Sequence, residues 1–393
     1  MVMTSIYIHI PFCKQRCIYC DFITYAGMEA YLPGYIQAIC SEVEILGQIH
    51  QGCEVISSIY IGGGTPSLMS GKQIESILHS LRKWFLIKDD AEITIEANPG
   101  TLGGRDLHAF RELGINRLSF GAQSLNYDCL KKLGRIHDVK DIYQSIETAY
   151  TSGFDNVSID LIFNLPWQSL QDWKEDLKNA IGLGTQHLSL YNLTLEPGTQ
   201  LFQSVNAGIY PQLNDDLAAD MYIIAQEALS SAGFVQYEIS NWSKGGNFES
   251  EHNKNYWRNL PYIGIGAAAH SYIHDARLEN IATIPEYIKV ISESQIKKSS
   301  LETSPANISQ MTLSKPEQMQ DTMMLGLRMT REGIREDWFS ERFDRQMGEI
   351  FAVQIGELVS SGLCEWGKID NTRCFRLTSS GILFGNRAFR MFV

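Results

Sequence analysis

The stretch that decides the fold is Ser5–Phe22, SIYIHIPFCKQRCIYCDF. Its alternating β-branched run Ser5–Ile10 predicts a strand, and the loop after it carries three cysteines in a C-x3-C-x2-C spacing: Cys13, Cys17 and Cys20. Three thiolates on one loop can hold three irons of a 4Fe–4S cluster and leave the fourth iron open. Three buried free thiols and a zinc site are the alternatives, although no fourth ligand follows in a C-x2-C pair.

Outward from this loop, the same strand–loop–helix rhythm continues to about residue 192. Five more strands are predicted, at Ser58–Ile61, Glu92–Glu96, Arg117–Phe120, Ser158–Ile162 and His187–Tyr191. Amphipathic helices are predicted between them at 29–50, 70–85, 103–113, 126–151 (broken near Gly134) and 169–182. This alternation predicts an α/β fold, a partial (β/α)6 barrel with its active face at the C-terminal ends of the strands.

After residue 200 the rhythm changes. A helix at 213–232 and a strand at Gln236–Ser240 precede the segment 241–273, which has little periodicity. Residues 291–316 are rich in Ser, Thr, Lys and Gln and are predicted to be a linker or connection. Helices and a hairpin turning at Asp370–Asn371 follow, which favours a small α+β winged-helix-like domain. We therefore divide the chain into 1–290, 291–316 and 317–393.

Composition narrows the function. Lys and Arg number 33 against 45 Asp and Glu, a formal charge of −12, so no nucleic-acid partner is expected. The N-terminus lacks the pattern of a secretory signal, and no run of 18 apolar residues occurs, so we expect no transmembrane segment. Eight cysteines are too few for a disulfide scaffold. A cytoplasmic protein is predicted.

The cysteine spacing on the first strand–helix loop resembles radical S-adenosylmethionine (SAM) proteins. The segments YIHIPFC, GGGTPS, IEANPG, SFGAQS and IDLIFNLP resemble the oxygen-independent coproporphyrinogen dehydrogenase branch of that superfamily, and the resemblance covers roughly residues 5–275. It implies two cofactors: a 4Fe–4S cluster on the cysteines and SAM, whose amino and carboxylate groups chelate the open iron.

Polar and glycine residues at the predicted strand ends are the candidates for binding SAM. Side-chain-free backbone at Gly63 and Gly64 lets a ligand approach closely, although a plain tight turn explains it too. Glu96, Gln123 and Asp160 stand at strand ends, where turn capping is the alternative. The resemblance implies one SAM near Tyr7, Tyr19, Gly63, Glu96 and His270, and a second near Gly64, Thr65, Gln123, Arg135, Asp160 and Thr194.

Two departures from the dehydrogenase pattern point to its sister group. Asp21 and Phe22 follow Cys20 where the dehydrogenase has a further cysteine, and the long N-terminal extension is missing. Both features match the HemW heme chaperones. So does HNKNYW, residues 252–257, an HNxxYW motif that implies a heme site at His252, Asn253, Tyr256 and Trp257. We take His252 as the first axial-ligand candidate and Tyr256 as the second; a packed loop is the alternative.

The function predicted from this resemblance is a heme chaperone that binds heme and transfers it to an apo-hemoprotein acceptor. The alternative is a coproporphyrinogen III dehydrogenase using a 5′-deoxyadenosyl radical, and a third, weaker candidate is radical SAM heme degradation. No catalytic residue is assigned. Peripheral membrane association and a homodimer are further expectations by analogy.

Overall fold

A computed structural model describes residues 2–50, 54–294 and 302–393. Its main sheet has twelve strands in the order β14-β13-β12-β11-β1-β4-β5-β6-β7-β8-β10-β9. The six predicted strands are parallel neighbours in it, which confirms the partial barrel: β1 (Val2–Ile10), β4 (Glu54–Gly63), β5 (Leu86–Ala97), β6 (Arg117–Gln123), β7 (Val157–Phe163) and β8 (His187–Asn192).

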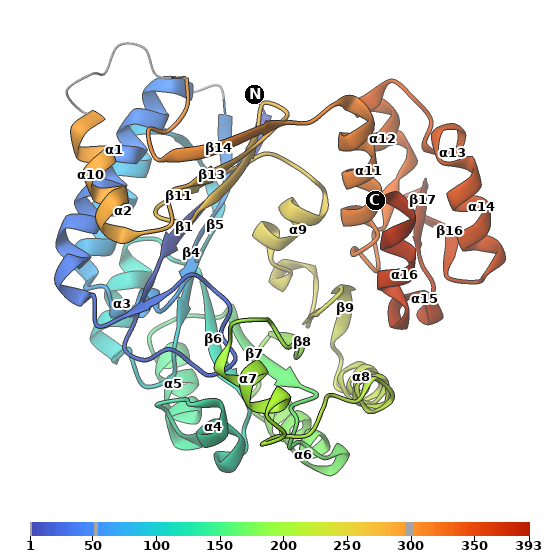
Figure 1. Cartoon of the computed structure of the whole chain (residues 1–393), viewed down its shortest axis with the longest axis horizontal. Coiled ribbons are helices and arrows are strands. Elements are labelled where there is room, and N and C mark those ends of the chain that lie inside the picture. The colour runs from blue at the N-terminus through green and yellow to red at the C-terminus, as the bar shows by residue number, and fades with distance from the viewer. Residues whose placement is uncertain (1, 51–53, 295–301) are drawn as a thin grey trace.

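Helices joining these strands cover the outer face of the sheet (Figure 1). They are α1 (Leu32–His50), α2 (Gly71–Trp84), α3 (Gly104–Glu112), α4 (Tyr127–Leu133), α5 (Val139–Thr151) and α6 (Leu170–Gly182). Ser70, Asp138 and Ser169 start α2, α5 and α6 with capping boxes. Gly134 ends α4 in a left-handed conformation, φ 75°, so the predicted break lies where a residue without Cβ was needed. Their apolar faces form one core with the strands.

Both edges of the sheet extend beyond the predicted strands. On one side lie α7 (Gln200–Asn206), α8 (Asp215–Ser231), β9 (Val235–Glu238) and β10 (Asn241–Ser243). On the other side β11 (Tyr262–Ile265) runs parallel to β1, and β12 (His270–Ile273), β13 (Ala276–Asn280) and β14 (Asn307–Thr312) follow antiparallel. The segment 241–273 is therefore more ordered than its sequence indicated.

The expected connection over 291–316 is not a plain linker. α10 (Ile284–Ser294) reaches into it, and β14 is the edge strand of the main sheet, paired with β13. Residues 295–301 of this range lie outside the described residues. β14 was missed because its residues are nearly all exposed, so its sequence shows no alternation of apolar and polar positions.

The C-terminal part has its own apolar core and a three-stranded sheet, β15-β17-β16. It contains α11 (Lys315–Gly326), β15 (Ile334–Arg335), α12 (Glu336–Phe343), α13 (Met347–Ile350), α14 (Ala352–Ser360), β16 (Cys364–Ile369), β17 (Thr372–Leu377), α15 (Ser379–Leu383) and α16 (Gly385–Phe389). Asp370 and Asn371 turn the hairpin with φ of 48° and 65°. This confirms the small α+β domain. Among the described residues, no helix combines the length and the apolar character of a membrane span.

One short helix, α9 (Glu251–Trp257), lies between the barrel and the C-terminal domain (Figure 1). It packs on β4 of the barrel and on α11 of the C-terminal domain. Just after it, the Arg258 guanidinium pairs with the Glu332 carboxylate through two hydrogen bonds, and Nη1 of Arg342 donates to the carbonyl oxygen of Asn259 at 2.7 Å. The HNxxYW segment is thus held from both sides.

Candidate cofactor-binding site

A cavity opens at the C-terminal ends of the barrel strands and has a volume of about 390 Å³. Pockets for one small ligand usually measure roughly 300–1,000 Å³. It collects residues from the cysteine loop and from the ends of several strands, including Cys13, Cys17, Cys20, Tyr19, Gly63, Gly64, Thr65, Glu96, Gln123, Arg135, Asp160 and Thr194. Twelve residues predicted from the sequence therefore share one space.

The cysteine loop is fastened at both ends. β2 (Phe12–Cys13) pairs with β3 (Tyr25–Ala26), and Nε2 of His9 lies 2.9 Å from the carbonyl oxygen of Ile23. Burial raises the pKa of the Cys13 and Cys20 thiols above the ordinary value. Because a metal-binding cysteine must be a thiolate, any metal bound by these cysteines would displace their protons.

The glycines Gly63 and Gly64 serve the cysteine loop itself. A Cβ on Gly63, which has φ 117°, would lie 2.6 Å from the His9 ring, and a Cβ on Gly64 would lie 2.6 Å from the carbonyl oxygen of Phe12. The Gly64 amide donates to the carbonyl oxygen of Ile10 at 2.9 Å. Because Gly63 and Gly64 have no side chains, the end of β4 can pack against the cysteine loop. This packing explains the two glycines without a bound ligand, which the sequence-based interpretation had not considered.

Glu96 and Asp160 are partly buried carboxyl groups on the cavity wall. Glu96 accepts hydrogen bonds from the Tyr60 hydroxyl at 2.8 Å and from the Gly63 amide at 3.0 Å. Burial raises the pKa of Glu96 to about 7, and it raises the pKa of Asp160 as well. Asp160 accepts from the Ser119 hydroxyl at 3.3 Å. At neutral pH a ligand's amine or hydroxyl group would thus meet, at Glu96, a carboxyl group that is ready to change its protonation state.

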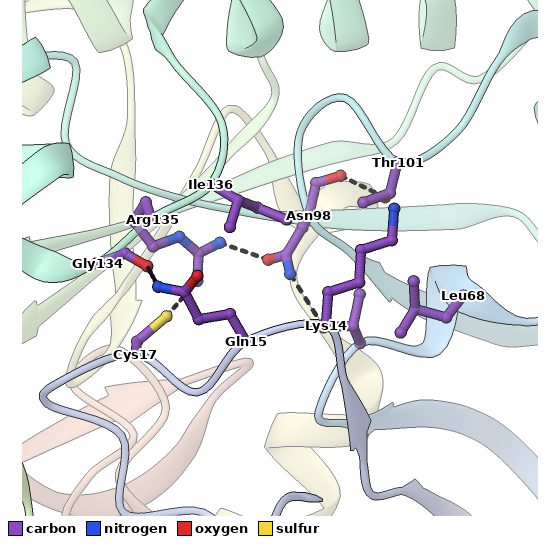
Figure 2. A pocket seen from close by; sticks show the side chains of 10 residues that line it. Lys14, Gln15, Cys17, Leu68, Asn98, Thr101, Gly134, Arg135 and Ile136 are labelled. Atoms are coloured by element: carbon purple, nitrogen blue, oxygen red, sulfur yellow. Dashed lines mark hydrogen bonds between the residues drawn. The ribbon is translucent and has the colours of Figure 1, made fainter. Parts of the chain in front are cut away.

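Arg135 joins the barrel wall to the cysteine loop (Figure 2). Nη1 donates to Sγ of Cys17 at 3.4 Å, and Nη2 donates to the carbonyl oxygen of Gly121 at 2.7 Å and to Oδ1 of Asn98. Asn98 in turn donates to Oγ1 of Thr65 at 3.0 Å. Sequence reasoning missed Asn98, although its place just after β5 in IEANPG was an available signal.

Tyr7 and His270 are not among the residues that line the cavity. The Tyr7 hydroxyl is hydrogen-bonded to Nδ1 of His9 at 2.9 Å, so it supports the residue that holds the cysteine loop. His270 begins β12 with an exposed side chain. Tyr7 nevertheless lies near the other candidates, because its ring stacks on that of Tyr60, which donates to Glu96.

The HNxxYW helix is anchored by long-range contacts. The Glu92 carboxylate accepts from the Ser250 hydroxyl and from the backbone amides of Glu251 and His252, and so caps the start of α9. The Asn253 amide donates to the Ser250 hydroxyl oxygen at 3.3 Å. At the other end of the helix, the Arg328 guanidinium stacks on the Trp257 ring at 4.4 Å.

His252 is 1% exposed, and both ring nitrogens have partners. Nδ1 lies 2.9 Å from the Ser58 hydroxyl, whose single hydrogen is donated to Ser5, so Nδ1 carries the proton and donates to Ser58. Nε2 then holds the lone pair and accepts from the Tyr256 hydroxyl at 3.0 Å. Burial and the nearby Arg117 charge lower the pKa of His252 to about 3, which keeps the ring neutral.

None of the four HNxxYW candidates lines the cavity. In this conformation Nε2 of His252 would reach an iron only after its hydrogen bond to Tyr256 opens.

Comparison with known proteins agrees with this geometry. The model of the Radical SAM superfamily matches residues 7–180, and that of the HemN C-terminal domain matches residues 313–384. Coproporphyrinogen III oxidase (HemN) from Escherichia coli, described as a radical SAM enzyme, has the same fold, with a TM-score of 0.81 over 100% of this chain and 90% of that one at 21% identity. Fold and site thus define a radical SAM protein.

The heme chaperone HemW of Bacillus subtilis is 35% identical over 100% of this chain and 99% of its own length, and that of Lactococcus lactis is 33% identical over 99% and 97%. Escherichia coli HemW is 41% identical over 68% of this chain and 70% of its own length. The chain belongs to the HemW family.

Proposed function

We propose that this chain is a heme chaperone, which binds heme and passes it to an apo-hemoprotein, with a 4Fe–4S cluster and SAM as its cofactors. The observation that carries the proposal is similarity to proteins named heme chaperone HemW over the whole chain, including the C-terminal domain. The cavity that collects the cysteine loop and the SAM candidates supports it.

Cys13, Cys17 and Cys20 would hold the cluster. A single zinc ion needs its sulfur ligands within about 4 Å of one another. Within the described ranges, three potential ligand atoms meet within 4.8 Å of one another at a different group, not at these thiols. Three thiolates on one loop would hold three irons of a cubane, and the cluster with SAM would supply one-electron chemistry when bound.

SAM would lie against the carboxyl and guanidinium groups of the cavity. Glu96 would face the SAM on the cluster. For a second SAM, Asp160 suits the amine or ribose hydroxyls and Arg135 suits the carboxylate. Gln123 and Thr194 add neutral polar groups on the same wall.

Heme would engage the chain through α9. Nε2 of His252 is the nitrogen with the lone pair, and the proton on Nδ1 is held by Ser58, which is the arrangement that a metal-binding imidazole requires. Binding therefore depends on an opening in which the Tyr256 hydroxyl leaves Nε2.

Anaerobic reconstitution followed by absorption spectra tests the proposal. We expect a 4Fe–4S spectrum that is lost in Cys17→Ala, a heme spectrum after adding hemin, and transfer of that heme to an apo-hemoprotein. Oxygen-free protein with no iron–sulfur core would remove the cofactor assignment, and a chain that takes up no heme would remove the chaperone function.

A second candidate is the coproporphyrinogen III dehydrogenase, because the fold matches that enzyme over the whole chain. Incubation of the reconstituted protein with SAM, reductant and coproporphyrinogen III separates the two functions. Stoichiometric protoporphyrinogen would establish the dehydrogenase and defeat the chaperone. We expect the substrate to be recovered unchanged.

A further inference from the structure

Three potential metal ligands from distant segments meet at the N-terminal end of the main sheet. His50 is the last residue of α1, Glu54 is the first residue of β4, and His274 lies in the turn between β12 and β13. One ligand atom from each lies within 4.8 Å of the others. β4 rises about 3.3 Å per residue, so this group is about 30 Å from the cavity at the strand's other end.

The distances suit a transition-metal ion. Nδ1 of His50 is 3.0 Å from Oε1 of Glu54, and Nε2 of His274 is 3.9 Å from the same oxygen. Around a tetrahedral zinc ion with bonds of about 2.0–2.1 Å, neighbouring ligand atoms lie about 3.3 Å apart. Small side-chain movements would therefore bring all three residues onto one ion.

Simple packing leaves part of this group unexplained. Glu54 is 5% exposed, yet its Oε2 has no hydrogen-bond partner among the described residues. A buried carboxylate oxygen without a partner costs free energy, and a coordinated cation would supply the missing interaction. The side chain of His274 is 73% exposed, so the fourth side of the group faces water.

The types of donor select the metal. Mg²⁺ and Ca²⁺ prefer oxygen ligands, whereas two imidazole nitrogens with one carboxylate suit Zn²⁺ and leave one position for water. We propose that His50, Glu54 and His274 form a Zn²⁺ site, separate from the cysteine loop, that ties the last residue of α1 and the first residue of β4 to the β12–β13 turn. This proposal does not depend on the proposed heme function.

Zinc binding by the full-length chain tests the site. The cysteine loop is first removed as a competitor by the triple change Cys13→Ser, Cys17→Ser and Cys20→Ser. Titration against a chromophoric chelator should then give one Zn²⁺ per chain, and Co²⁺ in its place should give tetrahedral d–d bands without a thiolate charge-transfer band.

The matched variants separate a metal site from an ordinary His–Glu pair. His274→Ala should weaken Zn²⁺ binding by more than about 100-fold, and because this side chain is exposed the variant should fold. His108→Ala changes a surface His–Glu pair of 3.6 Å and should leave the affinity unchanged. Equal affinity in the two variants, a thiolate band with Co²⁺, or no stoichiometric zinc in the triple variant would overturn the proposal.

Discussion

Replacing Tyr256 by Phe tests whether His252 becomes a heme ligand. The change removes one hydroxyl and keeps the ring, whose edge-on contact with the Tyr262 ring has a centroid distance of 4.6 Å. That hydroxyl donates to Nε2 of His252 at 3.0 Å. The variant therefore leaves a buried lone pair without its donor, on the nitrogen that we expect to bind iron.

Two opposite effects follow from this loss. A buried acceptor without its donor costs about 1–3 kcal/mol, so the free energy of unfolding of the heme-free variant should fall by that amount. Heme, however, no longer has to break a hydrogen bond with a net value of about 1 kcal/mol. Because 1.4 kcal/mol is a factor of ten, the dissociation constant for heme should fall about fivefold.

Denaturant unfolding followed by circular dichroism measures the first effect, and anaerobic hemin titration followed at the Soret band measures the second. Tyr262→Phe is the control, because the Tyr262 hydroxyl makes no hydrogen bond to His252. An unchanged heme affinity in Tyr256→Phe would refute the role of His252. Weaker binding would also refute it, and would point to Tyr256 as the ligand.

Three further predictions concern the cavity. Gly64→Ala places a Cβ 2.6 Å from the carbonyl oxygen of Phe12 and should lower the free energy of unfolding by about 1–3 kcal/mol. The variant should also contain less iron after reconstitution, and full iron loading would contradict the packing role of this glycine. Arg135→Ala removes the donor to Sγ of Cys17 and should weaken SAM binding in equilibrium dialysis, whereas unaltered binding would exclude the guanidinium as a SAM contact. Burial raises the pKa of Glu96 to about 7 in the native state, whereas in the unfolded chain this carboxyl group loses its proton from about pH 4.5 upward. The native state therefore binds one more proton than the unfolded state between these two values. The free energy of unfolding of the apo-protein should fall between pH 4.5 and 7, by about 3 kcal/mol. The free energy of unfolding of Glu96→Gln should not fall in this range. If it depends on pH in the same way as that of the unaltered protein, the raised pKa of Glu96 is contradicted.

Local sequence signals predicted the barrel and the convergence of its site. Parallel strands that all end at one face bring their following loops together, so motifs far apart in sequence, such as those of Cys13 and Asp160, were expected in one place. The structure confirms this for most of the SAM candidates. Such reasoning needs only the period of the apolar residues and the positions of the strand ends.

Long-range partners could not be predicted in the same way. Ser58 is 194 residues from His252 in the sequence, and Glu92, which accepts a hydrogen bond from the His252 backbone amide, is 160 residues away. The residues next to the HNxxYW motif therefore gave no sign that both imidazole nitrogens would have partners. His50 and His274 are likewise separated by most of the barrel. Their meeting follows from β11 and β12 extending the sheet beside β1, a pairing that the irregular segment 241–273 did not indicate.

The contacts between the α9 region and the C-terminal domain affect how the chain can be divided. A protein truncated before α11 would leave Arg258 without Glu332 and uncover the face of Trp257 on which Arg328 stacks. In the truncated protein α9 would be less firmly held, so its measured heme affinity would differ from that of the full-length chain. The properties of α9 should therefore be measured with single substitutions in the full-length chain and not with the isolated barrel.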